Sequence, residues 1–314
     1  MNKETMRIIF MGSAEFACPS LESLWKADFV ELVGIVCQPE RPSGRRLEIS
    51  KCPVDRYASA CNLPVLRPEK VNARENIDAL RALKPDLIVV VAYGQILRRE
   101  ILALPPKGCV NLHASLLPKY RGAAPIQWAI ANGEKVTGVT AMFMNEKMDA
   151  GDIIAREEEQ IAPDDTAKTL GRRLCARGSG LLLKTMEMIA RDGAPRFRQD
   201  EALVTFAPML KKQDGLLDWN KPAQELENRI RAFQSWPVCF FILNGKKVNV
   251  LRGRVEPGCG KEAGALVDAR GEGPLIQCGE NALRLLEVQP EGKKPMSGSA
   301  FLCGNKMAVG EKLA

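Results

Sequence analysis

The chain has 314 residues and a formal net charge of +7, with 45 Lys and Arg against 38 Asp and Glu. Hydrophobic residues make up 46% and charged residues 26%, a globular composition that argues against disorder. No apolar run approaches the roughly 20 residues of a membrane-spanning helix, and the single histidine excludes zinc sites with two or three His ligands.

Cysteine usage and the first residues point to a compartment. The ten cysteines are scattered and form no CxxC pair, so a disulfide scaffold is disfavoured. The start, MNKETMRIIF, shows no cleavable apolar segment after a basic stretch. We expect a cytoplasmic protein with reduced thiols.

The first part of the chain alternates apolar runs with amphipathic segments, which indicates an α/β domain. Continuous apolar runs, without alternating polar residues, are typical of parallel strands that are covered on both faces. Parallel sheets of this kind bind ligands at the carboxyl ends of their strands. We predict strands over residues 7–11, 32–36, 87–91, 109–112, 136–144 and 153–161, and helices over 19–27, 75–84, 125–132 and 166–191.

The pattern changes after about residue 193. The segment RDGAPRFRQDEALVTFAPML has no clear periodicity and is interpreted as a linker. Short strands with frequent glycines follow, which favours a small β-barrel; they are predicted over 238–243, 247–255, 264–268, 274–278 and 283–288. The expected domains are 1–192 and 209–314, with a linker over 193–208.

Phosphate-binding loops are disfavoured. GSAEF follows the first strand but does not match GxGxxG, and GxxxxGK[ST] is absent. Gly12 is therefore interpreted as a strand-to-helix turn, with a ligand contact as the alternative.

The most informative stretch is NLHASLLPKYRGAAP, from residue 111 to 125. Asn111 and His113 stand two apart at a strand end, so both side chains point to the same side. A neutral imidazole beside a carboxamide can accept a proton and polarise a carbonyl. A lone histidine at a strand end is more often structural, but the long Pro- and Gly-containing loop after it favours function.

A second element, MDAGD, places Asp149 and Asp152 in a loop between two strands. Asp-x-Gly alone is more typical of a turn. Together, however, the two segments resemble the 10-formyltetrahydrofolate-dependent formyltransferases, which share an Asn–x–His pair, a Ser-Leu-Leu-Pro loop and a later Asp. GSAEF and VVVAYGQIL fit the same family.

The second half carries the resemblance further. LDWNKPAQELENRIRAFQSWPVCFF, GALVD and LRLLEVQPEGKKPMSGSAFLCGN resemble the C-terminal domain of the family members that act on methionyl-tRNA. The resemblance covers nearly the whole chain; its least typical parts are Ser13-Ala14 and residues 43–50. It implies a Rossmann-like, mostly parallel catalytic domain, followed by an OB-like barrel that binds tRNA.

The resemblance implies a reaction and its residues. A formyl group would move from 10-formyltetrahydrofolate to the α-amino group of methionine on initiator tRNA, without a metal. We expect a monomer, because nothing in the sequence suggests a larger assembly. Asn111 would donate to the oxyanion, His113 would accept a proton or stabilise that oxyanion, and Asp149 would orient His113, raise its basicity or hold a relay water. Asp152 is expected to be structural.

The resemblance also implies binding residues. Folate would be bordered by Ser115, Leu116, Leu117 and Pro118, and by the loop residues Tyr93, Gly94, Gln95 and Ile96. The tRNA would meet a loop with Arg41, Arg45 and Arg46, for which a plain surface loop is the alternative. Residues 221–254 hold seven cations against two carboxylates, a local +5, and Arg229, Arg231, Lys246 and Lys247 are the candidates there. The aromatics Phe233, Trp236, Phe240 and Phe241 are expected mainly in the core.

Three alternatives stay open on the sequence. A sugar-nucleotide N-formyltransferase would keep Asn111, His113 and Asp149 without needing a basic second domain. A formyl-folate hydrolase would use water as acceptor. A non-catalytic RNA-binding module would make the barrel primary, although the intact Asn-x-His, SLLP and Asp set argues against it.

Overall fold

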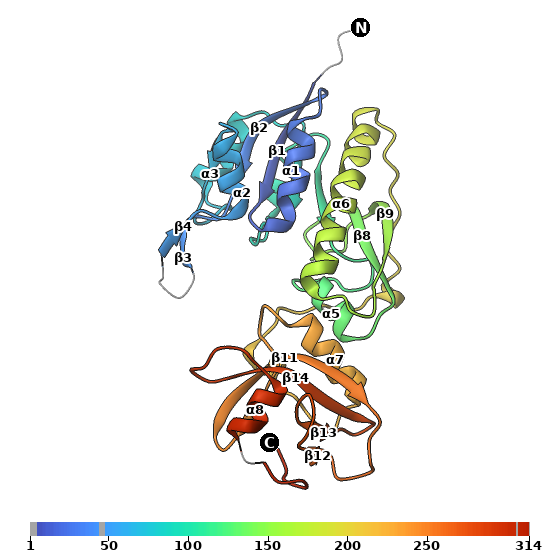
Figure 1. Cartoon of the computed structure of the whole chain (residues 1–314). Helices are drawn as coiled ribbons and strands as arrows, with labels where there is room; N and C mark the ends of the chain where they lie inside the picture. The colour runs from blue at the N-terminus through green and yellow to red at the C-terminus, as the bar shows by residue number, and fades with distance from the viewer. Residues whose placement is uncertain (1–4, 44–47, 306, 314) are drawn as a thin grey trace. The chain divides into compact units, whose positions relative to one another are not determined.

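The computed structural model describes residues 5–43, 48–305 and 307–313. The chain forms two compact units, each described by itself. The first comprises the chain up to Gly122 together with Val136–Gln160 and Gly171–Phe206, and the second comprises Ala123–Lys135, Ile161–Leu170 and the chain from Ala207 onward. Figure 1 shows both in ribbon form.

The first unit is built on a seven-stranded sheet. Its strands are β1 (Met6–Gly12), β2 (Val30–Val36), β5 (Val65–Leu66), β6 (Leu87–Val91), β7 (Cys109–His113), β8 (Val136–Phe143) and β9 (Ile153–Gln160). They lie in the order β5-β2-β1-β6-β7-β8-β9. The pairings from β5 to β7 are parallel, whereas β7–β8 and β8–β9 are antiparallel. The expected mostly parallel, Rossmann-like sheet is confirmed.

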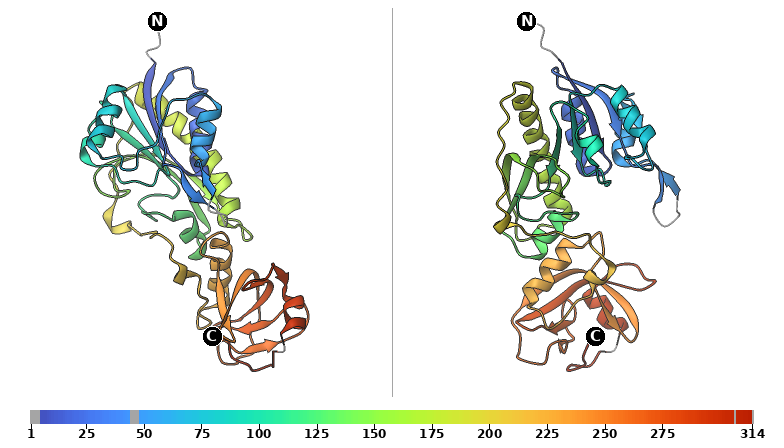
Figure 2. Two further views of the ribbon diagram at one scale, coloured as in Figure 1. Left: turned by 90° about the vertical axis from the view of Figure 1, so that its left-hand side faces the viewer. Right: turned by 180° about the vertical axis from the view of Figure 1, so that it is seen from behind.

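Helices cover both faces of this sheet (Figures 1 and 2). The helices of this unit are η1 (Glu15–Ala17), α1 (Cys18–Trp25), α2 (Pro53–Ala60), α3 (Arg74–Ala82), α4 (Arg99–Leu102), η2 (Glu201–Leu203) and α6 (Ala167–Ala190), most of which belongs to this unit. Ile77 and Leu80 of α3 pack in one hydrophobic cluster with Ile9 and Met11 of β1. Every residue of β6 is buried, as a central parallel strand requires. The short strands β3 (Arg41–Ser43) and β4 (Glu48–Ser50) pair with each other.

The second unit contains a six-stranded antiparallel sheet. Its strands are β10 (Phe240–Leu243), β11 (Lys246–Glu256), β12 (Leu266–Asp268), β13 (Leu275–Gln277), β14 (Ala282–Pro290) and β15 (Met296–Ser297). The order is β10-β11-β14-β13-β12, and β15 pairs with β14. The architecture agrees with the expected OB-like β-domain.

The second unit also holds helices that the sequence patterns did not predict. Its helices are α5 (Pro125–Ala131), η3 (Lys212–Gly215), α7 (Ala223–Ala232) and α8 (Gly298–Gly304), of which only α5 was expected. Leu226 and Ile230 of α7 are spaced for one helix face and are buried. Trp128 of α5 meets Phe233, the residue after α7, edge to face, with ring centroids 5.6 Å apart.

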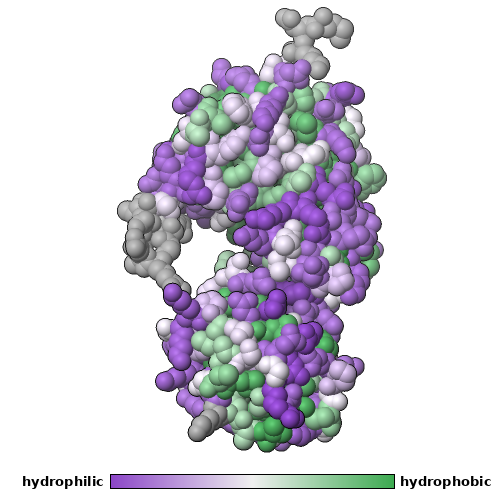
Figure 3. Space-filling view, viewed as in Figure 1, coloured by the Kyte–Doolittle hydropathy of each residue, from purple (hydrophilic) through white to green (hydrophobic). Residues whose placement is uncertain are grey.

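The surfaces of the two units differ in character. In Figure 3, hydrophilic residues dominate the viewed face of the first unit over α6, whereas the viewed face of the second unit mixes hydrophobic and hydrophilic areas. Across the ranges that the structure describes, no helix combines the length and apolar character that a bilayer crossing requires.

Candidate active site

The loops at the carboxyl edge of the parallel sheet are bonded to one another. The backbone N–H of Ser13 donates to the carbonyl of Ala92 at 3.2 Å. The hydroxyl of Ser13 donates to Tyr93 O at 3.1 Å and accepts from the N–H of Gln38 at 3.0 Å. A Cβ at Gly12 would stand 2.9 Å from Val91 O, so this turn has no room for a side chain. The first turn thereby fixes the loop that follows β6.

His113 ends β7 and is 7% exposed. Its Nε2 lies 2.9 Å from the carbonyl oxygen of Tyr120. Because a carbonyl only accepts hydrogen bonds, Nε2 carries the hydrogen and Nδ1 of the neutral ring carries the lone pair. Nδ1 faces Oδ2 of Asp149 at 3.7 Å, beyond hydrogen-bond distance.

The carbonyl that holds the imidazole belongs to a residue in an unusual conformation. Tyr120 has φ +60°, a left-handed backbone that costs a bulky residue about 1–2 kcal/mol. Its N–H donates to Oγ1 of Thr205 at 2.9 Å, which helps to hold this conformation. Such strain is often retained where a site needs a particular geometry.

Asp149 reaches β7 from the loop between β8 and β9. Its Oδ1 lies 3.4 Å from Nδ2 of Asn111, and its Oδ2 accepts the N–H of Gly122 at 2.8 Å. Asp149 has φ +50°, which Asp and Asn tolerate better than most residues. A Cβ at Gly151 would lie 1.7 Å from Phe143 O, so the loop can return to β9 only through glycine.

These three side chains have a defined chemical capacity. Asn111 supplies an amide donor, and Nδ1 of His113 can take a proton. The imidazolium so formed would face the carboxylate of Asp149. The structure brings together the three residues that the sequence predicted as one site.

The predicted SLLP border of a folate site is largely turned inward. Ser115 and Leu117 are fully buried. The Ser115 hydroxyl donates to Lys119 O at 2.6 Å, and Leu117 clusters with Met142 and Ile153. Pro118 is buried, and Leu116 packs against β8 at Gly138.

The loop after β6 is more accessible. Tyr93 is buried, burial raises the pKa of its phenol, and its hydroxyl is bonded to no group in the described part of the chain. The side-chain amide of Gln95 bridges Val71 N and Pro68 O. Gly94, with φ +91°, is exposed, and Ile96 is 71% exposed. Of the predicted residues in this loop, Gly94 and Ile96 are therefore the exposed ones.

Some of the predicted tRNA-binding cations form hydrogen bonds within the protein itself. Arg45 and Arg46 lie outside the described residues, as does the side chain of Arg41, whose backbone begins β3. The guanidinium of Arg231 bonds Glu227, Asn228 and Asp165 O, and that of Arg229 bonds Asp214 O.

The lysines of β11 are more available. Lys246 is exposed. Lys247 lies over the ring of Phe240, 4.1 Å from its centroid, and burial lowers the pKa of its ammonium. The aromatic side chains of Phe233, Phe240 and Phe241 are buried, whereas that of Trp236 is 55% exposed.

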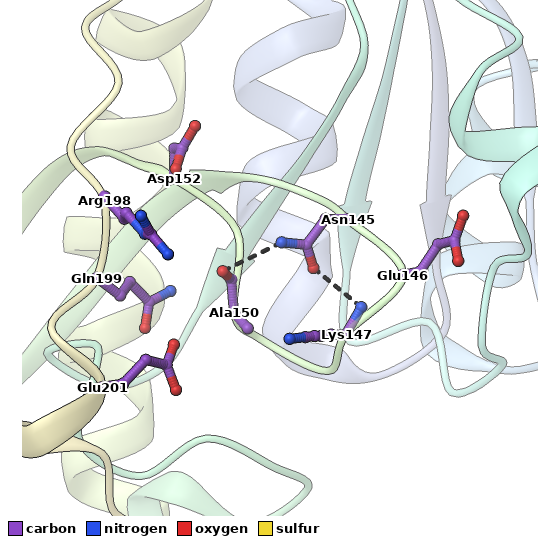
Figure 4. A pocket seen from close by; sticks show the side chains of 8 residues that line it. All are labelled: Asn145, Glu146, Lys147, Ala150, Asp152, Arg198, Gln199 and Glu201. Carbon is purple, nitrogen blue, oxygen red and sulfur yellow. Dashed lines mark hydrogen bonds between the residues drawn. The ribbon is translucent and has the colours of Figure 1, made fainter.

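Sequence reasoning missed three residues that touch this site: Arg121, Gln199 and Thr205. Arg121 follows the SLLP loop, and the other two lie in the segment predicted as a linker. Gln199 also lines a recess of about 430 Å³, drawn in Figure 4, with Asn145, Glu146, Lys147, Ala150, Asp152, Arg198 and Glu201. The guanidinium of Arg121 bonds Glu201 and lowers the pKa of that carboxyl. No sequence signal marked Gln199 and Thr205, because they lie outside periodic segments. Arg121 lies within the stretch of residues 111–125, but no role was predicted for it.

A metal has no evident ligand set here. Among the described residues, no group of three or more His, Cys, Asp and Glu side chains is placed to hold one.

Comparison with known protein families matches both parts of the chain. Residues 6–186 match the formyl transferase family, and residues 209–306 match the formyl transferase C-terminal domain.

Individual relatives extend over nearly the full length. The chain is 47% identical to the methionyl-tRNA formyltransferase of Moorella thermoacetica, over 98% of this chain and 99% of the relative. It is 46% identical to the methionyl-tRNA formyltransferase of Desulfotalea psychrophila, over 98% of this chain and 95% of that relative. Among solved structures, an N-formyltransferase from Helicobacter canadensis, in complex with folinic acid and dTDP-3-aminofucose, has a similar fold. It matches with a TM-score of 0.65 at 19% identity, over 90% of this chain and 99% of its own.

Proposed function

The chain belongs to the formyl transferase family, and on that premise we propose that it moves the formyl group of 10-formyltetrahydrofolate to the α-amino group of methionine on initiator tRNA. The observation that carries the proposal is the meeting of Asn111, His113 and Asp149, with separations of 3.4 Å and 3.7 Å to the carboxylate. Near-complete similarity to methionyl-tRNA formyltransferases supports the choice of acceptor.

The proposed reaction assigns one role to each side chain. As the amine attacks the formyl carbon, the carbonyl oxygen gains negative charge and the Asn111 amide donates to it. Nδ1 of His113 takes the proton that the attacking amine loses, because Nε2–H is bonded to Tyr120 O. The carboxylate of Asp149 stabilises the imidazolium. The proton returns to the nitrogen that leaves the formyl carbon, so that protons balance over the cycle.

The donor's place is proposed at the carboxyl edge of the sheet. Gly94 and Ile96 offer an exposed backbone and apolar surface, as a pterin ring requires. The buried Ser115, Leu117 and Pro118 would shape this border through the backbone rather than through their side chains.

The acceptor decides between this proposal and its alternatives. We expect formyl transfer to methionyl initiator tRNA, with much weaker transfer to the same tRNA lacking its amino acid, to a dTDP-amino sugar or to water. The measurement uses formyl-labelled 10-formyltetrahydrofolate and follows label in each acceptor and in free formate. Label in the sugar nucleotide or in formate alone would contradict the proposal. The proposal also takes the enzyme to be a cytoplasmic monomer, which light scattering and cell fractionation can check.

The lysines at the start of β11 are proposed to grip tRNA phosphates. Lys246→Gln with Lys247→Gln keeps polar, unbranched side chains and removes two charges. We expect tRNA affinity to fall about tenfold, and the slope of log affinity against log salt to fall by about 1–2. Binding titrations at several salt concentrations measure both.

Lys261→Gln is the matched control, because it removes an exposed charge from the same unit outside the proposed surface. The control removes one charge and the double variant two, so a control loss of about half the double variant's loss in log affinity would indicate a general charge effect. An unchanged salt slope in the double variant would remove these lysines from the tRNA surface.

A further inference from the structure

Gln199 is a buried residue whose side chain has every polar group bonded. It is 5% exposed. Its amide nitrogen donates to Asp149 O at 2.9 Å and to Gly151 O at 2.8 Å. Its amide oxygen accepts from Nε and Nη2 of Arg121 at 3.1 and 2.8 Å. Two donors and two lone pairs are the full capacity of this group, so the amide is fixed in one orientation.

Arg121 in turn ties Gln199 to the loop that follows His113. The residue is 5% exposed, and its guanidinium also bonds both carboxylate oxygens of Glu201 at 3.0 and 3.3 Å. Its backbone N–H donates to Thr205 O at 2.9 Å. The next residue, Gly122, gives its N–H to the carboxylate of Asp149. The segment of residues 197–206 thus bonds both to the loop that carries Asp149 and to the loop that follows His113.

We propose that Gln199 is a positioning residue for Asp149, holding the backbone on which that carboxylate is mounted. Asp149 stands at φ +50° in a loop whose neighbours from Asn145 to Met148 are exposed. Its backbone carbonyl is held by Gln199, whereas its carboxylate faces Nδ1 of His113. Figure 4 shows the Gln199 side chain directed toward the loop that carries Ala150.

The inference rests on the proposed function, because it assigns Gln199 an effect on the formyl-transfer step. Groups that orient metal ligands in other proteins cost about 10–100-fold when removed, and we expect the same order for a group that orients this carboxylate. A misplacement of about 1 Å can cost 10²-fold. The Michaelis constants for folate and tRNA depend on other surfaces. A positioning role therefore predicts a fall in kcat at nearly unchanged KM.

Gln199→Glu is the main test. The variant keeps an oxygen for Arg121 but places a carboxylate against two carbonyls, so the bonds to Asp149 and Gly151 are lost. We expect kcat to fall about 10–100-fold while KM for methionyl-tRNA changes less than about threefold. Gln199→Met, which removes the polar groups at similar length and without charge, gives the same pattern if the glutamate variant fails to fold.

Gln277→Glu is the matched control. Gln277 is also buried, and its amide nitrogen donates to two backbone carbonyls, Cys278 O and Asn281 O, both at 2.9 Å. It lies in β13 of the second unit and has no proposed role. Both variants should lower the midpoint of thermal unfolding, but only the change at Gln199 should lower kcat when measured well below that midpoint.

A double-mutant cycle with Asp149→Asn separates positioning from general damage. If Gln199 acts through Asp149, adding Gln199→Glu to Asp149→Asn should lower kcat by less than about threefold more, because residues that act as a unit are not additive. An additive loss, or a single variant within twofold of the parent kcat, would overturn the inference. Absence of formyl transfer by the parent protein would instead overturn the proposed function.

Discussion

His113→Ala should lower kcat for formyl transfer about 10²–10⁴-fold, the usual contribution of a positioned acid–base group. No second imidazole exists in the chain to replace it. The buried ring is bonded to Tyr120 O and faces Asp149, so the substitution removes the proposed proton acceptor and leaves the charged surface residues in place. Single-turnover measurements with enzyme in excess isolate the chemical step.

Binding provides the control for this variant. Affinity for methionyl-tRNA should stay within about threefold of the parent value, because His113 is buried in the first unit and the proposed phosphate contacts lie on β11. A variant that transfers formyl within tenfold of the parent rate would remove His113 from the proposed mechanism.

Asp149→Asn should lower kcat about 10²-fold or more, in line with the loss of an electrostatic partner in a preorganised site. Asparagine tolerates the φ of +50° and can still accept the N–H of Gly122 through its oxygen. The substitution removes the negative charge opposite Nδ1 of His113 and also the acceptor for Nδ2 of Asn111, because the new amide nitrogen takes the place of Oδ1. Alanine would mix this effect with a change in backbone preference, so asparagine gives the cleaner measurement.

Asp152→Asn is the matched control for that variant. Asp152 lies in the same loop, but its carboxylate is 3.8 Å from Arg196 and has no contact with Asn111 or His113 in the described part of the chain. We expect its kcat to stay near the parent value. Equal losses at the two positions would indicate that loop charge, rather than the carboxylate beside His113, determines the rate.

The sheet of the first unit was predictable because its signals are local. The run Leu87–Val91 is a buried strand with the predicted ends, and β8 and β9 agree with prediction to within a residue. The two-residue strand β5 and the helices α2 and α7 were not predicted. Each is short, and the sequence of α7 contains more polar than apolar residues, so packing against neighbours defines it.

The meeting of the three proposed site residues was predictable, but the residues that hold them in place were not. Asn111 and His113 are two apart on one strand, and a motif leads to Asp149. Gln199 is 50 positions from Asp149 and 78 from Arg121, in a segment without periodicity. Hydrogen bonds between residues so far apart in the sequence form only when the chain has folded, so no local sequence pattern predicts them.

The predicted binding residues show a different limit. The apolar residues of the SLLP segment pack on β8 and β9: Leu116 lies against Gly138, and Leu117 clusters with Met142 and Ile153. Composition does not distinguish an apolar residue that meets a ligand from one that fills the core. The folate contacts therefore stay a prediction, as do the tRNA contacts of Arg41, Arg45 and Arg46.

Because His113 is the single histidine of the chain, its imidazole can be observed by spectroscopy without overlap from another histidine. With one histidine, the imidazole region of a nitrogen-15 spectrum contains the signals of His113 and no others, so they need no assignment by mutation. Because Nε2 is hydrogen-bonded to Tyr120 O and Nδ1 faces Asp149, the two ring nitrogens have different environments. Their chemical shifts report which nitrogen carries hydrogen. Titrating folate or tRNA into the labelled protein would follow the proton at the proposed reaction centre directly.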